Sequence, residues 1–282
     1  MLIAALSVTL HLLSGGLDRT YHFYRPPVVR QSDRAPLVVV LHGGYGTGMQ
    51  AEKDYGWDEL AQRGRFLVAY PDGVGRSWSA GLCCGPAKKR NIDDVAFIGA
   101  MVAAIERTQN ADPRRVYVTG MSNGAMMAYR LACEAPFPIA AVGSVAGTLD
   151  TDSCPHPQRT AVMEIHGLND EHVPFNGGVG VNHPQPQPFR SVAATLAVWQ
   201  KANACGEPFV SRNGVTNVER WTCSRGGHVE LVSIANAGHE WPGSRKGPRG
   251  ALLGALLHIA PADPVSDALD ATQALWDFFT QR

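Results

Sequence analysis

The sequence predicts a single large α/β domain, in which a mostly parallel central sheet is covered by helices on both faces. From Tyr21 almost to the end, short runs of strand-forming residues alternate with longer helical patterns. Most strand runs are apolar throughout, as expected of strands buried on both faces. With 282 residues, 45% of them hydrophobic and only 18% charged, the chain can fill one large core, which excludes a disordered state.

The strands and helices follow from local composition. Compact runs of Val, Ile, Leu and aromatic residues predict six strands: 37–41, 66–70, 116–119, 141–145, 162–165 and 229–234. Helical spacing or good helix formers, several of them introduced by Asp or Asn, predict five helices: 58–63, 93–109, 124–134, 189–202 and 267–280. No repeat or second domain is visible, so we expect one domain over residues 17–282.

Residues 1–16 (MLIAALSVTLHLLSGG) are apolar but lack a basic start and a clear cleavage site. We expect an irregular export signal. The alternative is a buried first strand or a stretch left over from cloning. No later run has about 18 uninterrupted apolar residues, so we expect no integral membrane segment. Lys and Arg total 25 and Asp and Glu total 25, so no net field attracts nucleic acid.

The motif Gly120-Met121-Ser122-Asn123-Gly124 follows one predicted strand and begins the next predicted helix. In this context G-x-S-x-G is typical of a nucleophile elbow, which exposes a serine hydroxyl at the start of a helix. A serine needs a base, and the base needs an orienting acid. In α/β-hydrolases the chain order is serine, acid, histidine. Asp170 follows the strand 162–165 and His239 follows the strand 229–234, so Ser122, Asp170 and His239 are the predicted triad.

Other residues compete weakly for these roles. His42 and His166 directly follow strands, where we expect them to hold their loops by local hydrogen bonds. Asp150, Asp152 and Glu171 remain alternatives for the acid. His156, His172, His183 and His258 lie in polar or Pro-rich segments.

An oxyanion requires preorganised N–H donors. We expect one from the backbone of Asn123 and another from the glycine-rich stretch after the first predicted strand, with Gly44 as first choice and Tyr45 as second. No Lys-Ser/Thr follows this stretch and no G-x-G-x-x-G is present, so we expect no nucleotide cofactor. No C-x-x-C pair or H-E-x-x-H is present, so we expect no metal.

The order of LHGGYG, SWSAGLCCGPA, GMSNGAMMAYRLAC, IHGLND and GHEWPG resembles esterases of the polyhydroxybutyrate depolymerase type and their relatives, the feruloyl and acetyl xylan esterases. The likeness runs from about residue 18 to the end. It implies an α/β-hydrolase fold, export from a bacterial cell to the periplasm or medium, no cofactor and hydrolysis of esters. The stretch Ala251–Ile259 is more apolar than such loops usually are.

Six cysteines in an exported chain predict disulfides. Cys205 and Cys223 flank 17 residues, and closing such a loop contributes about 3 kcal/mol in the chain-entropy model. We pair them, as the resemblance also suggests. Cys83, Cys84, Cys133 and Cys154 allow three connectivities; we favour Cys83 with Cys84 and Cys133 with Cys154, and buried free thiols are the alternative.

Aromatic residues are expected at the carboxyl ends of the strands, where ligands bind. Trp78, Trp241 and Phe175, together with Tyr45, are the candidate substrate contacts. No long amphipathic insertion separates the elbow from Asp170, so we expect an open site without a large lid. The predicted function is a serine esterase acting on short hydroxyalkanoate, feruloyl or related esters. A peptidase or acyltransferase with the same triad and an inactive binding protein are the alternatives.

Overall fold

The computed structural model describes residues 7–181, 187–245, 263 and 265–281. Within them the chain forms a ten-stranded sheet with the order β1-β2-β4-β3-β5-β6-β7-β12-β11-β10. Six neighbouring strands are parallel: β4 (Leu67–Pro71), β3 (Ala35–Leu41), β5 (Ala111–Met121), β6 (Ala141–Val145), β7 (Ala161–Gly167) and β12 (Val229–Ile234). The mostly parallel sheet predicted from the sequence is confirmed.

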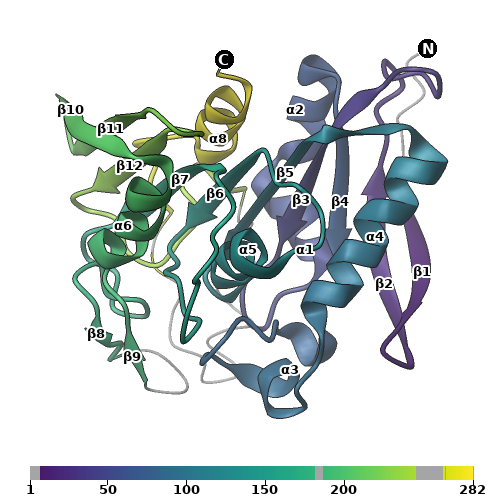
Figure 1. Cartoon of the computed structure of the whole chain (residues 1–282), viewed down its shortest axis with the longest axis horizontal. Helices are drawn as coiled ribbons and strands as arrows, with labels where there is room; N and C mark the ends of the chain where they lie inside the picture. The colour runs from purple at the N-terminus through teal and green to yellow at the C-terminus, as the bar shows by residue number, and fades with distance from the viewer. Residues whose placement is uncertain (1–6, 182–186, 246–262, 264, 282) are drawn as a thin grey trace.

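Helices cover both faces of this sheet (Figure 1). On one face lie α4 (Asp94–Gln109), α5 (Asn123–Glu134) and α6 (Val192–Asn203). On the other lie α1 (Gly48–Tyr55), α2 (Trp57–Gly64) and α8 (Ala271–Thr280). A short helix, α3 (Gly85–Lys89), and a 3-10 turn over Val74–Arg76 complete the loop after β4.

The two cores follow from the alternation of side chains along the central strands. In β3, Leu37, Val39 and Leu41 pack under α4 and α5, whereas Val38 and Val40 pack under α1 and α2. Every residue of β3 is buried, which explains why its sequence is apolar throughout and does not alternate between apolar and polar residues.

Antiparallel strands extend the sheet at both edges. β2 (Leu17–Tyr24) pairs with β4, and β1 (Val8–Ser14) pairs with β2 as the edge strand. The domain boundary predicted after residue 16 is therefore corrected, because residues 8–14 already belong to the sheet. At the other edge, β10 (Cys205–Asn213) and β11 (Thr216–Cys223) form a hairpin on β12. A small separate sheet joins β8 (Gly178–Val179) to β9 (Pro188–Phe189).

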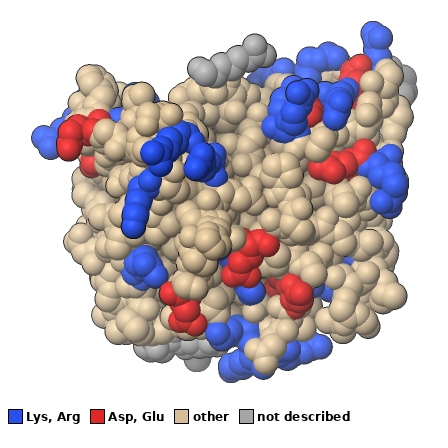
Figure 2. All heavy atoms as spheres, viewed as in Figure 1, with Lys and Arg blue, Asp and Glu red and all other residues tan. Residues whose placement is uncertain are grey.

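Figure 2 shows small groups of Lys and Arg and of Asp and Glu spread over one face, both near its centre and at its edge, with uncharged surface between them. The interspersed signs fit the formal net charge of zero. No helix among the described residues has both the length and the apolar character needed to cross a bilayer. The apolar stretch Ala251–Ile259 lies outside the described residues.

Candidate active site

Ser122 occupies the sharp turn between β5 and α5. Its backbone lies at φ 55° and ψ −123°, a conformation that is strained for a residue with a side chain. Its N–H donates to the carbonyl of Val145 at 2.9 Å, and its carbonyl accepts from the N–H of Met126, so the turn is fixed from both sides. This geometry is that of the predicted elbow.

Glycines on either side of Ser122 let neighbouring backbones approach. A Cβ on Gly124 would collide with the carbonyl of Leu41, and one on Gly120 would lie 2.8 Å from the same oxygen. The loop after β3 therefore lies directly against the start of α5. At Gly43, a Cβ would lie 3.6 Å from the Cβ of Ser122, which places this glycine-rich loop beside the serine.

Asp170 and His239 meet although they come from different loops. His239 Nδ1 lies 2.8 Å from Asp170 Oδ2. The other carboxylate oxygen, Oδ1, accepts from the N–H groups of His172 and Val173 at 2.9 and 2.8 Å. Burial raises the pKa of Asp170, but His239 and His166 beside it outweigh this and hold the pKa well below its usual range. The carboxylate is thus held ionised and fixed in orientation.

The loop carrying His239 is held by the carboxylate of Asp263. The backbone N–H of His239 donates to Oδ2 of Asp263 at 2.5 Å. Gly238 has no side chain, and a Cβ there would collide with that same carboxylate. The imidazole of His239 stacks on that of His172 with ring centroids 4.8 Å apart.

Three side-chain ligand atoms in this loop region are close enough to share a metal ion. They belong to Asp170, His172 and His239 and lie within 4.8 Å of one another. The hydrogen bond between His239 and Asp170 already uses two of these groups, so a metal there would compete with the pair.

The glycine-rich loop after β3 corrects one prediction about the oxyanion donors. The N–H of Tyr45 donates to the carbonyl of Arg76 at 2.8 Å, so this donor is already committed. The side chain of Tyr45 is 54% exposed. Asn123 is the first residue of α5, where N–H groups have no acceptor within the helix. Gly44 and Asn123 therefore remain the predicted donors.

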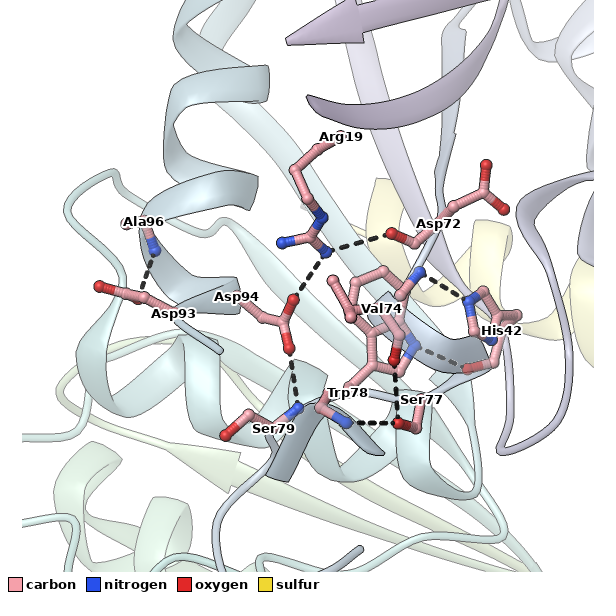
Figure 3. Close-up of polar contacts among 12 residues, drawn as sticks. Arg19, His42, Asp72, Val74, Ser77, Trp78, Ser79, Asp93, Asp94 and Ala96 are labelled. Atoms are coloured by element: carbon pink, nitrogen blue, oxygen red, sulfur yellow. Dashed lines mark hydrogen bonds and ion pairs between the residues drawn. The ribbon is translucent and has the colours of Figure 1, made fainter. Parts of the chain in front are cut away.

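Buried polar contacts brace this loop (Figure 3). As expected, His42 bonds locally: its Nδ1 lies 2.7 Å from the carbonyl oxygen of Gly43, and its Nε2 accepts from the N–H of Gly73. The indole N–H of Trp78 donates to the carbonyl of His42 at 2.9 Å. The side chain of Asn123 bonds both the N–H and the carbonyl of Trp78. Trp78 thus links the glycine-rich loop to the start of α5.

The loop after β4 is anchored in turn by a buried ion pair. Nη2 of Arg19 lies 2.7 Å from Oδ1 of Asp94, and both side chains are almost fully buried. The second oxygen of Asp94 accepts from the N–H of Ser79, and Arg19 also donates to the carbonyl of Asp72 (Figure 3). No pattern in the sequence singled out this pair, because its partners are 75 residues apart.

Two of the predicted substrate contacts are wrong. Trp78 and Trp241 are both fully buried. Trp241 stacks on Tyr55 at 4.1 Å between ring centroids, and its N–H donates to Thr272. Both indoles therefore pack beneath loops and offer no face to a ligand. Phe175 is partly exposed and lies edge to face with His166, so it remains a candidate.

The competing acid Asp150 has a structural role. Its carboxylate accepts from the backbone N–H of Cys83, and burial raises its pKa to about 6. Asp152 and Glu171 are exposed. The cysteines form three disulfides, Cys83 with Cys84, Cys133 with Cys154 and Cys205 with Cys223, which are the pairings favoured from the sequence.

Comparisons with known proteins agree with this fold. A family model described as esterase PHB depolymerase matches residues 19–179, more than half of the chain. The protein named "Putative esterase NocK" of Nocardia uniformis subsp. tsuyamanensis is 31% identical over 90% of this chain and 80% of its own length. Feruloyl esterase B of Piromyces equi is 30% identical over 73% of this chain, but the match spans only 39% of that protein.

The solved acetyl xylan esterase from Aspergillus awamori has a TM-score of 0.64 at 17% identity, covering 90% of this chain and 100% of that one. At this identity the likeness shows the fold, which is that of the α/β-hydrolases. The match of the family model and the 31% identity to the Nocardia protein lead to one conclusion: the chain belongs to the polyhydroxybutyrate depolymerase family of esterases.

Proposed function

We propose that the protein is a serine carboxylic-ester hydrolase that works through an acyl-enzyme. The observation that carries the proposal is the strained turn of Ser122 at the start of α5, together with the hydrogen bond between His239 and Asp170. A serine in this conformation presents its hydroxyl above the sheet, and a histidine held by a carboxylate is the base that such a hydroxyl needs.

In this mechanism Ser122 Oγ attacks the ester carbonyl while His239 Nε2 takes its proton. Asp170 holds the Nδ1–H tautomer and stabilises the imidazolium that forms. The N–H groups of Gly44 and Asn123 donate to the oxyanion. His239 then protonates the departing alcohol, and water, activated by the same histidine, releases the acid from Ser122.

The proposed substrates are short hydroxyalkanoate oligomers or polyesters, feruloyl esters and related aromatic esters. The names of the family and of its relatives support ester chemistry of this kind. Three disulfides fit an oxidising compartment, so we also propose that the protein acts outside the cytoplasm.

The test compares the parent with Ser122→Ala on p-nitrophenyl butyrate, methyl ferulate, acetylated xylan, a hydroxybutyrate film and an anilide. Ser153→Ala, which alters an exposed serine, is the matched control. Ser122→Ala should lose at least about a thousandfold in kcat/KM on every ester, whereas the control should match the parent. Turnover by Ser122→Ala within tenfold of the parent would refute the proposal, and faster turnover of the anilide than of the esters would redirect it to a peptidase.

A further inference from the structure

Behind Asp170 lies a buried pair of ionisable side chains that the mechanism above does not use. Glu164 and His166 are two residues apart in β7, so they lie on the same face of the strand. Their side chains are 1% and 0% exposed. Burying such groups is costly unless each is paired and hydrogen-bonded. Their contacts therefore reveal their protonation states.

Both ring nitrogens of His166 face acceptors. Nδ1 lies 2.7 Å from Oε1 of Glu164. Nε2 lies 2.9 Å from the carbonyl oxygen of Val173 and 3.4 Å from Oδ2 of Asp170. A neutral imidazole has a single N–H and cannot donate in both directions. The doubly protonated imidazolium satisfies every one of these contacts.

Electrostatics favours the same state of His166. Burial lowers its pKa, but hydrogen bonds to the carboxylates of Asp170 and Glu164, together with their charges, raise the pKa to about 10. Because three acceptors surround one ring, the cation is stabilised even though water is excluded.

Glu164 has the contacts of an ionised counter-ion. Besides the bond to His166, its Oε2 accepts from the hydroxyl of Tyr129 at 2.8 Å. Its Oε1 also accepts from the N–H of Gly147 at 3.4 Å. Burial raises the pKa of Glu164, but the hydrogen bonds from His166 and Tyr129 and the charge of His166 oppose this shift and favour the ionised carboxylate.

Asp170 lies between the imidazoles of His239 and His166. The same atom, Oδ2, lies 2.8 Å from Nδ1 of His239 and 3.4 Å from Nε2 of His166. We propose that His166 is a positioning residue of the site: a buried imidazolium that holds Asp170 ionised from behind and offsets part of its charge, with Glu164 as counter-ion. The proposal rests on the proposed function, in which His239 acts as the base.

The consequence for the reaction is electrostatic. His166, the cation of the pair, contacts Asp170 directly, so it opposes a second positive charge on His239. The other charged or titratable groups near His239 are His172, which stacks on it, Asp263, which accepts from its N–H, and its neighbour Glu240. These groups are unchanged in the variants proposed below, so their influence cancels in the comparison.

The first test measures the charge of His166 directly. We would record histidine ¹⁵N NMR spectra of the Ser122→Ala protein at pH 8 and assign the His166 signals by their loss in His166→Gln. Two protonated ring nitrogens are expected. One protonated and one unprotonated nitrogen would overturn the proposal, and this result does not depend on whether Ser122 is the nucleophile.

The second test measures kcat/KM against pH for the parent and for Glu164→Gln/His166→Gln. The double variant replaces the ion pair with two amides and leaves no unpaired carboxylate. In the double variant, the midpoint of the acid limb of kcat/KM should lie about one pH unit higher than in the parent. kcat/KM should therefore be lower than in the parent by about tenfold near pH 5.5 and by less than about threefold at pH 8.5. The matched control is His228→Gln, which alters a histidine just before β12, at the opposite end of that strand from His239, and it should keep the parent profile.

A uniform loss at every pH with an unmoved midpoint would contradict the proposal and leave the pair with a structural role only. If the double variant does not fold, the NMR measurement still decides. Retained activity of Ser122→Ala would instead refute the proposed function. The two failures are therefore distinguishable.

Discussion

His239 Nδ1 lies 2.8 Å from Asp170 Oδ2, although 69 residues separate the two in the chain. Each residue follows the carboxyl end of a strand, and β7 and β12 are parallel neighbours in which Ile234 pairs with Gly167. A side chain on Gly167 would collide with the carbonyl of Ala237, so only glycine lets the two loops approach this closely. The sheet topology therefore brings the pair together.

The first prediction concerns the acid. Asp170→Asn should lower kcat/KM for p-nitrophenyl butyrate by about 10³-fold to 10⁴-fold, because an amide cannot stabilise the imidazolium and favours the wrong tautomer of His239. Asp152→Asn, which alters an exposed carboxylate in an earlier loop, is the control and should remain within threefold of the parent. Similar losses in both variants would rule out Asp170 as the acid.

The second prediction concerns the disulfide between Cys205 and Cys223, which joins β10 to β11 at the edge of the sheet. Replacing both cysteines with serine should lower the free energy of unfolding by about 3 kcal/mol, because the unfolded chain gains loop entropy. Denaturant unfolding measures this change. The activity should be unchanged, since the hairpin lies beyond β12; an unchanged stability would show that the bridge does not constrain the chain.

The third prediction concerns stability at alkaline pH. The pKa of His166 is about 10 in the folded state, against an ordinary value of 6.5, so the folded protein binds the extra proton between these values. The stabilisation is fully present below pH 6.5 and is lost as pH rises towards 10. Between pH 7 and 9.5 the Tm of the parent should fall by at least about 3 °C more than that of Glu164→Gln/His166→Gln, measured by thermal unfolding. Parallel curves would contradict the raised pKa.

The fourth prediction concerns acyl-chain length. Tyr45 is exposed and Phe175 is partly exposed, and they lie in the loops that carry Gly44 and Asp170, a placement that suits short or aromatic acyl groups. Turnover of p-nitrophenyl butyrate should exceed that of the palmitate by at least about tenfold. Phe175→Ala should raise KM for methyl ferulate more than for p-nitrophenyl acetate. Faster turnover of the palmitate would favour a lipase instead.

The central sheet was predictable from the sequence, because strands buried on both faces are apolar throughout and begin and end at clear turns. All six predicted strands are present. The hairpin of β10 and β11 was missed because none of its residues is fully buried and most are polar, so no apolar run marks it. Its signal was Asn213-Gly214, a dipeptide typical of hairpin turns, and Gly214 does adopt a positive φ.

The sequence also predicted that Asp170 and His239 would meet, because chain order and strand ends fix both positions. It could not show that Trp78 and Trp241 are buried, since an aromatic residue after a strand can face either the ligand or the core. Nor could it show that the N–H of Tyr45 is already bonded, because its acceptor, Arg76, lies in another loop. These are tertiary contacts with no local pattern.

The most direct test of the central claim is the site of covalent labelling by an organophosphate or a sulfonyl fluoride, read by mass spectrometry of the labelled peptides. These reagents react with a serine only when a neighbouring base activates it. We expect one label per chain, on Ser122, with labelling abolished in Ser122→Ala and strongly slowed in His239→Ala. A label on another serine, or unchanged labelling of the Ser122→Ala protein, would contradict the account.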